Sequence, residues 1–421
     1  MKRYSTGLSD NVKQLLDKEI KIPNPYAVEV GGEISSERIS GKDVILYPGT
    51  RIYGEKTLIS RGTRLGYESP VTVVDCHIGP EVELKGGFFK SSVFLAKSNM
   101  ASGAMVREGC LLEEEANAGH TVGLKQTMLF PFVTLGSLIN FCDCFMAGGT
   151  SRKDHSEVGS SYIHFNYTPN QDKATPSLIG DVPKGVMLNQ LPIFLGGQGG
   201  LVGPAIIGYG TVIAAGTVYR NDCPEGGKLL IGENDAVSKK TFHMGLYGSI
   251  NRRVYNNILY LANLLALRQW YIHIRQPFFH RQDMGAELYT GAMDTLDLMI
   301  EERLKRFQIL SEKMEKSLEV GKKILQGNRA KTLMQQKKEL LENWSNLETC
   351  FTNGQETGID LKNRDTFIEV INHTIAREGE IYLRVIKNLD KPSSTTGTTW
   401  LQHIIDHVTQ SALSQLPSFS P

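Results

Sequence analysis

A six-residue spacing of apolar side chains restricts the fold of this sequence more than any other feature. From Cys76 onward, every sixth residue as far as Phe130 is apolar, although only 40% of the chain is apolar. The series is Cys76, Val82, Phe88, Phe94, Met100, Val106, Leu112, Ala118, Leu124 and Phe130. Two shorter series share the spacing, Leu46, Ile52, Leu58 and Ile206, Val212, Val218. The recurrence indicates a repeated structural unit.

A period of six fits neither of the simple amphipathic elements, because a helical face recurs every 3.6 residues and a strand alternates every two. It fits a β-solenoid, in which each step turns the chain onto the next face and one apolar residue points inward. Each coil then buries its faces against its neighbours. Small residues between the steps suit tight corners. The alternative is a glycine-rich sandwich with accidental spacing.

Glycine content separates the two parts of the chain, since 32 of the 42 glycines lie in residues 1–240. Within 251–350, apolar residues recur at three- and four-residue spacing with Glu and Lys between them, which predicts amphipathic helices. We expect further helices near 364–388 and 398–414, with a loop over 390–399.

The predicted organisation is mainly β plus α. A short helix near 9–19 is expected to lead into an extended arm. The predicted domains are an N-terminal helix and arm over 1–41, a solenoid over 42–236 and an α-helical domain over 237–421.

Composition narrows the function classes. Lys and Arg total 46 against 45 Asp and Glu, so a strongly basic nucleic-acid binder is disfavoured. Six Cys without a CxxC pair predict neither a disulfide framework nor a common zinc site. The N-terminus lacks the apolar core of a secretory signal, and no apolar run is long enough to span a membrane. We therefore expect a cytoplasmic protein without nucleic-acid or membrane partners.

Three stretches between residues 118 and 222 together carry a family resemblance. They are Ala118-Gly119-His120, then NYTPNQDKATPSLIGD from Asn166, then GPAIIGYGTVIAAGTVYRND over 203–222. In this order they resemble the acetyltransferase domain of the bacterial bifunctional glucosamine-1-phosphate N-acetyltransferase/UDP-N-acetylglucosamine pyrophosphorylase family. The resemblance covers roughly 42–222. It implies a left-handed parallel β-helix of hexapeptide repeats, acetyl-CoA as co-substrate, and homotrimers with active sites between subunits.

The resemblance also implies roles for individual residues in transferring an acetyl group to an amino sugar phosphate or nucleotide sugar. His120 matches the general base, and neutral imidazole suits that task. Asn166 matches a residue that contacts the acetyl group and the amino sugar. Tyr167 matches the aromatic beside it, and Ala215 matches a small residue where the CoA arm passes. Without the resemblance, His120 reads as a corner histidine and Asn166-Tyr167 as a turn beside a packed ring.

Several positions depart from the family pattern. Arg107 and Lys173 are candidates for the sugar phosphate, but each is displaced by one residue. Asp172 stands where the family has a lysine, and Gly123 where it has a tyrosine. These departures bear on the sugar-phosphate substrate more than on the fold. The family's Gly-rich nucleotide-binding motif near the N-terminus is missing, so pyrophosphorylase activity is not expected.

Segment 136–165 is longer than its family counterpart and is expected to form a polar loop beside the site. Its His155 or His164 could replace His120 as base. A metal site of Cys142, Cys144, His155 and His164 is disfavoured by irregular spacing, so none is expected. Glycine-rich 195–203 is expected to belong to another insertion or to tight solenoid corners.

Two functions remain open at this stage. One is the acetyl-CoA-dependent N-acetyltransferase without a uridyltransferase domain. The other is a non-catalytic trimeric scaffold or sugar-nucleotide-binding protein whose helical domain binds a partner. The cations and aromatics of 252–275 could bind a nucleotide, or simply belong to a packed helix.

Overall fold

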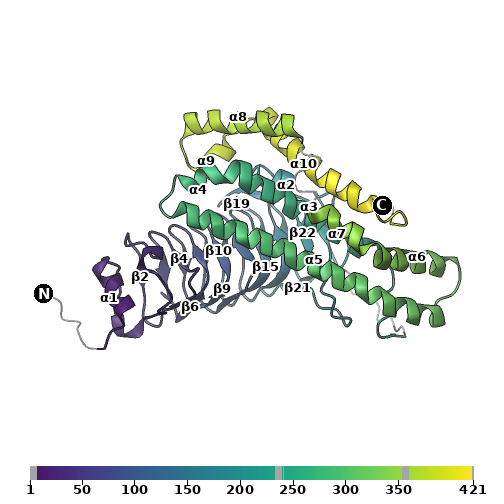
Figure 1. Ribbon diagram of the computed structural model, residues 1–421, viewed down its shortest axis with the longest axis horizontal. Helices are drawn as coiled ribbons and strands as arrows, with labels where there is room; N and C mark the ends of the chain where they lie inside the picture. The colour runs from purple at the N-terminus through teal and green to yellow at the C-terminus, as the bar shows by residue number, and fades with distance from the viewer. Residues whose placement is uncertain (1–6, 233–238, 240, 353–359, 420–421) are drawn as a thin grey trace.

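The computed structural model describes residues 7–232, 239, 241–352 and 360–419. A parallel β-solenoid of about 11 turns is followed by a helical region that lies along one side of it (Figure 1). This confirms the predicted fold class, and the stacked short strands are those of a hexapeptide-repeat β-helix. The predicted boundary near 237 lies outside the described residues. The last described solenoid strand ends at Leu230, and the first long helix begins at Asn251.

Each solenoid turn contributes a strand to three faces. We call these the ten-stranded face, the open face and the covered face. The ten-stranded face comprises β2 (Ile45–Leu46), β5 (Arg64–Leu65), β8 (Glu83–Leu84), β11 (Asn99–Met100), β14 (Asn117–Ala118), β16 (Thr134–Leu135), β20 (Glu157–Val158), β23 (Phe194–Leu195), β26 (Val212–Ile213) and β28 (Leu229–Leu230).

The open face follows the ten-stranded face along the chain. It comprises β1 (Glu29–Val30), β3 (Arg51–Tyr53), β6 (Val71–Val74), β9 (Gly87–Lys90), β12 (Ala104–Val106), the first halves of β15 (Gly123–Leu129) and β17 (Asn140–Met146), β21 (Ile163–Phe165), β24 (Gly200–Val202) and β27 (Val218–Tyr219). The strand β1 lies within the segment 1–41 that the sequence assigned to an arm.

The covered face comes next. It comprises β4 (Leu58–Ile59), β7 (His77–Ile78), β10 (Ser92–Phe94), β13 (Cys110–Leu112), the second halves of β15 and β17, β22 (Ser177–Ile179) and β25 (Ile206–Ile207). The strands β15 and β17 each bend around a corner and serve two faces.

The inward rows explain the six-residue period. Met100 pairs in register with Ala118, and Val106 with Leu124, so one turn takes 18 residues there. Every member of the long series is buried except Phe88. Phe88 lies on the outside of the open face, and its neighbour Phe89 fills the interior instead. The strict six-step prediction is wrong at this position because Phe89 pairs with Val106, so this turn takes 17 residues and not 18.

Glycines line the corner between the ten-stranded and open faces, here called the glycine corner. It consists of Gly119, Gly136, Gly159 and Gly196 with the residues that follow them, His120, Ser137, Ser160 and Gly197, and ends at Ala215. A Cβ on Gly159 would lie 2.4 Å from the Gly197 nitrogen, and one on Gly196 would lie 2.3 Å from the Ala215 nitrogen. Successive turns can therefore stack closely here only without side chains. Of the glycine-rich stretch 195–203, Gly196 and Gly197 lie at this corner and β24 occupies 200–202, so the stretch belongs to the solenoid and not to an insertion.

Eight helices of different lengths follow the solenoid in the part of the chain that the structure describes. They are α3 (Asn251–Trp270), α4 (Gln276–His280), α5 (Gly285–Ile324), α6 (Asn328–Glu342), α7 (Trp344–Thr352), α8 (Leu361–Glu378), α9 (Tyr382–Lys387) and α10 (Lys391–Ser414). A π-helical turn, Tyr271–Arg275, joins α3 to α4. Two helices come earlier, α1 (Asp10–Asp17) at the N-terminal end of the solenoid and the short α2 (Val182–Gly185) (Figure 1).

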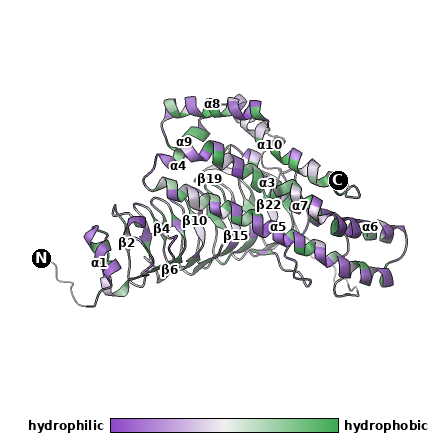
Figure 2. Ribbon diagram, viewed as in Figure 1, coloured by the Kyte–Doolittle hydropathy of each residue, from purple (hydrophilic) through white to green (hydrophobic). Residues whose placement is uncertain are grey.

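The covered face is apolar on both sides, which is why the helices lie on it. Its outward row consists of Val93, Leu111, Met128, Phe145 and Leu178 in register. These side chains share one buried cluster with residues of α3, α5 and α10. Apolar and polar residues alternate along α5, α6 and α8, as amphipathic helices require (Figure 2).

One predicted loop is a helix. Residues 390–399 were expected to form a loop, but α10 begins at Lys391. The Asp390 carboxylate accepts a hydrogen bond from the Ser393 nitrogen, and Pro392 occupies the first turn. An acidic N-cap followed by proline is a helix start, and the Ser/Thr content of the segment concealed it.

None of the helices among the described residues is long and apolar enough to cross a membrane.

Candidate functional site

His120 lies at the N-terminal end of the glycine corner, between β14 and β15, and its side chain is 60% exposed. Its Nε2 is 3.2 Å from an Oε2 of Glu68. Its backbone nitrogen donates to the Ser137 hydroxyl of the next turn at 3.2 Å. The structure therefore presents an accessible imidazole beside a carboxylate, which is the arrangement of a base with an orienting partner.

Glu68 reaches His120 from the corner loop between β5 and β6. Its Oε2 also accepts from the Ser102 nitrogen at 3.1 Å, and its Oε1 lies 3.4 Å from the Lys85 ammonium. Burial raises the pKa of this carboxyl, but the hydrogen bonds from Ser102 and the charge of Lys85 outweigh burial and lower the pKa overall. Glu68 is thus held as an anion against His120.

Ala215 lies on the same corner as His120, four turns further along. At about 4.8 Å per turn the two are roughly 19 Å apart. Between them the corner carries only Ser137, Ser160 and Gly197. The corner positions between His120 and Ala215 therefore carry no large side chain.

Asn166 lies elsewhere, at the far edge of the open face directly after β21. Its Nδ2 donates to Asp143 at 3.1 Å, and the other Asp143 oxygen lies 3.0 Å from the Arg303 guanidinium of α5. Arg303 also donates to the Lys173 carbonyl at 3.1 Å. Arg303 and Asp143 are both buried. The helical region thus holds the start and the end of the loop that follows Asn166.

Asp172 is fully buried in this loop. Its carboxylate accepts from the Tyr247 hydroxyl at 2.7 Å and the Thr168 hydroxyl at 2.8 Å, and lies 3.5 Å from the Arg253 guanidinium. Burial raises the Asp172 pKa, yet the charge of Arg253 and these hydrogen bonds lower it overall. An acidic residue at this position therefore binds the helical region internally.

The three other predicted substrate-binding residues differ in how exposed their side chains are. Tyr167 is 65% exposed, and the Lys173 side chain is half-buried. Arg107 is exposed on the open face, where it approaches Cys142 closely enough to lower the Cys142 pKa against the larger effect of burial. Gly123 begins β15 on the same face.

The structure does not bring His120 and Asn166 together within one chain. His120 precedes the open face, and Asn166 follows it two turns later. A face crossed by about six residues at ~3.3 Å each puts the two side chains roughly 20 Å apart. A site that uses both residues would have to combine two copies of the chain.

Segment 136–165 is mostly solenoid, which corrects the expected polar loop. It contains β17, β20 and β21, and only the antiparallel hairpin of β18 (Gly149–Ser151) and β19 (Asp154–His155) leaves the solenoid. The sequence missed this extra turn because Phe141 and Cys144 point inward from a stretch that carries several polar residues.

His164 and His155 are poorly suited to replace His120. His164 is buried, with Nδ1 2.6 Å from the Cys142 carbonyl and Nε2 2.8 Å from the Ser177 hydroxyl. Burial lowers its pKa to about 4. His155 Nδ1 lies 2.9 Å from the Arg152 carbonyl. Among the residues that the structure describes, no group of three or more His, Cys, Asp or Glu could hold a metal ion.

The arginines of 252–275 lie in contacts within the chain. Arg253 faces Asp172, Arg268 faces Asp297 at 2.7 Å, and buried Arg275 pairs with Glu114 and lies 3.6 Å from the centre of the Tyr382 ring. They therefore join the helices to one another and to the solenoid, as the packed-helix interpretation expects.

Glu68 is the residue at this site that sequence analysis missed. It lies 52 positions from His120, and no local pattern joins them. The sequence feature that could have pointed to Glu68 is its segment, Gly66 to Pro70, which is longer than a tight hexapeptide turn.

Fold and corner together define the chain as a hexapeptide-type β-solenoid with an exposed histidine at one corner and an appended helical region. About half of the chain is similar in sequence to curated proteins named bifunctional protein GlmU. The one from Thermotoga maritima is 27% identical over 220 residues, that from Carboxydothermus hydrogenoformans 25% over 228, and that from Synechococcus elongatus 27% over 203. No family model matches the chain.

The similarity is partial on both sides. It covers 51% of this chain and 42% of the Thermotoga maritima protein, 54% and 45% for Carboxydothermus hydrogenoformans, and 48% and 39% for Synechococcus elongatus. The chain thus spans less than half the length of these relatives. These homologues confirm the family resemblance of the solenoid.

Proposed function

We propose that the protein is an acetyl-CoA-dependent N-acetyltransferase that acts on an amino sugar, in the manner of a glucosamine-1-phosphate acetyltransferase. The homologues named GlmU support a transferase role of this class. The observation that carries the proposal is the exposed His120 with its Glu68 partner at the glycine corner. A cytoplasmic location stays a prediction from the sequence.

His120 would act as general base. A neutral imidazole that donates its Nε2 hydrogen to Glu68 keeps Nδ1 free as an acceptor. As the sugar amine attacks the thioester carbonyl, the new C–N bond forms and the C–S bond breaks. The proton leaves the nitrogen for His120 and passes to the departing thiolate. Glu68 stabilises the imidazolium that forms in between.

The bare part of the glycine corner would bind the CoA arm. Its roughly 19 Å from His120 to Ala215 suits an extended chain lying along the solenoid axis. Ala215 is exposed there. A larger residue at Ala215 would obstruct this path, which is why the resemblance and the geometry favour the same assignment.

Asn166, Tyr167, Arg107 and Lys173 would belong to the acceptor site, with Asn166 binding the acetyl oxygen. Because His120 and Asn166 lie at opposite edges of one face, we propose that the site forms between copies of a homotrimer. Exposed apolar residues on the ten-stranded face, Phe194, Val212 and Leu229, lie in register directly before the glycine corner. Contact between copies there would cover them.

The test is acetyl-CoA turnover, measured as free thiol, with glucosamine-1-phosphate and a panel of amino sugars. We expect thiol release that requires an amino sugar, and His120→Ala should lower kcat by about 10²–10⁴. The matched control is His373→Ala, which removes an exposed histidine from α8. No turnover with any amino sugar, together with no thermal stabilisation by acetyl-CoA, contradicts the proposal and favours the scaffold function.

A further inference from the structure

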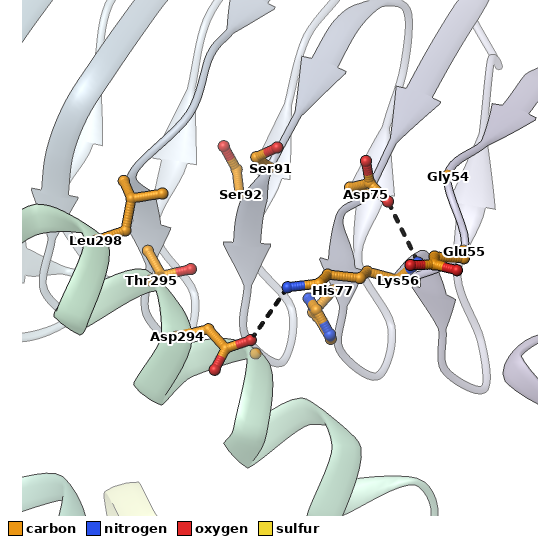
Figure 3. Close-up of a pocket in the computed structure, with 11 residues that line it drawn as sticks. Gly54, Glu55, Lys56, Asp75, His77, Ser91, Ser92, Asp294, Thr295 and Leu298 are labelled. Carbon is orange, nitrogen blue, oxygen red and sulfur yellow. Dashed lines mark hydrogen bonds and ion pairs between the residues drawn. The ribbon is translucent and has the colours of Figure 1, made fainter.

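A groove lies between α5 and the corner where the open face turns into the covered face. It encloses about 360 Å³ and is lined on the solenoid side by Asp75, His77 and Ser91 and on the helix side by Asp294 and Thr295 (Figure 3). A second cavity of about 330 Å³ shares His77 and Asp294 and extends it toward the start of α5. The groove is remote from the glycine corner, which lies at the other edge of the open face.

Two polar side chains in this groove are buried without partners. His77 is 8% exposed and Thr295 is 7% exposed. Within the described ranges, no residue hydrogen-bonds to the His77 ring or the Thr295 hydroxyl. The polar atoms of both residues are not among the fully buried side-chain atoms that lack a partner, so they still face the open groove. A molecule in the cavity could therefore form hydrogen bonds with them.

The position of His77 is fixed by a glycine of α5. A Cβ on Gly291 would lie 2.3 Å from the imidazole, so the helix can approach the solenoid here only through glycine. Burial, with the charge of nearby Arg38, lowers the His77 pKa to about 4. The ring is therefore neutral near pH 7, where it can donate one hydrogen bond and accept another.

The charge of the groove indicates what kind of molecule it takes. Glu55, Asp75 and Asp294 supply three carboxylates to the first cavity, against the single ammonium of Lys56. Lys56 crosses the groove to Asp294 at 3.6 Å, with both side chains more than half exposed (Figure 3). Such an exposed pair is weak, so a second cation can approach Asp294. Leu298 adds an apolar edge.

We propose that this groove binds a small organic cation that carries hydroxyl groups. Its ammonium group lies between Asp75 and Asp294, and its hydroxyls bond to His77, Ser91 and Thr295. The apolar side of the ligand lies against Leu298. The site does not depend on the proposed acetyltransferase activity, because none of its residues belongs to the glycine corner.

Calorimetric titration of the full chain tests the proposal with three probes. Glucosamine carries both the ammonium and the hydroxyls, glucose has only the hydroxyls, and butylamine has only the ammonium. We expect glucosamine to bind at least about tenfold more tightly than either of the others. Equal binding of glucosamine and glucose, or no binding of glucosamine, overturns the proposal.

Variants locate the binding. Thr295→Val keeps the shape of the side chain without its hydroxyl, and Asp294→Asn removes one charge from a side chain that is 55% exposed. Each should weaken glucosamine binding about tenfold or more, whereas the control Glu312→Gln, on an exposed part of α5, should not.

His120→Ala separates this site from the proposed acceptor site. Glucosamine binding that survives His120→Ala but weakens in Asp294→Asn supports the groove, even if acetyl transfer is never observed. Binding lost in His120→Ala and unchanged in both groove variants overturns the inference and leaves the proposed function intact.

Discussion

Two of the three segments that carry the family resemblance lie in opposite environments. His120 stands exposed on a corner built from glycines and small residues. The loop from Asn166 to Lys173 is held by Arg303, Arg253 and Tyr247 of the helical part of the chain. Motifs that are equally recognisable in the sequence thus differ in their exposure and in their contacts with the helical region. The corner is exposed, and the loop is joined to the helical region that follows the solenoid.

This difference gives the helical region a structural task. It covers an apolar solenoid face and also supplies the cations that neutralise buried carboxylates in the loop. Substitutions in the loop network should therefore change stability, and substitutions at the corner should change activity. Variants in the loop network and at the corner can test this separation of stability from activity.

The largest effect is expected from Arg303→Met. It leaves Asp143 charged and buried without its ion-pair partner, although the Asn166 amide still donates to it, and this costs about 3–5 kcal/mol of unfolding free energy. Denaturant unfolding measures this loss, and hydrogen exchange should show faster opening of 166–172. The double variant with Asp143→Asn should recover part of the loss. His120→Ala, by contrast, should change stability by no more than about 0.5 kcal/mol. A loss below about 1 kcal/mol in Arg303→Met would show that the loop does not depend on this pair.

The next effect is a pH dependence from His164. Its pKa of about 4 in the folded chain lies below the ordinary value of 6.5. The neutral ring therefore contributes stability that is complete above pH 6.5 and is lost as pH falls toward 4, by about 3 kcal/mol in total. Unfolding free energies at pH 7 and 4.5 should differ less in His164→Gln than in the parent chain. Equal pH dependence in the two proteins contradicts the prediction.

Tyr247→Phe should have a smaller effect. It removes the hydroxyl that donates to buried Asp172, while Arg253 and Thr168 still partner the carboxylate. A hydrogen bond to a charged group contributes about 1.5–3 kcal/mol. Denaturant unfolding should register a loss in this range, with acetyl transfer kinetics unchanged once the protein is folded. A lower kcat without lower stability would place Tyr247 in the active site.

The sequence predicted the solenoid because stacking repeats one buried position on every face. It located His120 at a corner for the same reason. It could not predict Phe89 in place of Phe88, because a turn shortened by one residue reverses which side chain points inward. The glycine corner was equally hidden, since its members are spread from Gly119 to Gly196 and meet only through register.

Long-range partners set the remaining limits. Asp172 looked unfavourable for a phosphate site, and only the fold shows that Arg253 and Tyr247 satisfy it. Glu68 and the groove at His77 also depend on residues distant in the chain. The spacing of apolar residues can predict a repeat. It cannot predict which charged residues of the solenoid and the helices pair, because these pairs do not recur at a fixed spacing in the sequence.

Glu68→Gln should give the smallest change in stability and therefore the sharpest test of the separation of stability from activity. Glu68 is partly exposed and its ion pair with Lys85 is at the surface, so the loss should be within about 1 kcal/mol. Without the carboxylate, His120 loses the group that stabilises its protonated form, and kcat for acetyl transfer should fall. Lys85→Met keeps Glu68 and serves as the control, because it removes the same surface ion pair without touching the imidazole. Equal kinetics in the two variants would mean that Glu68 acts only in the corner's structure, and that His120 works without an orienting partner.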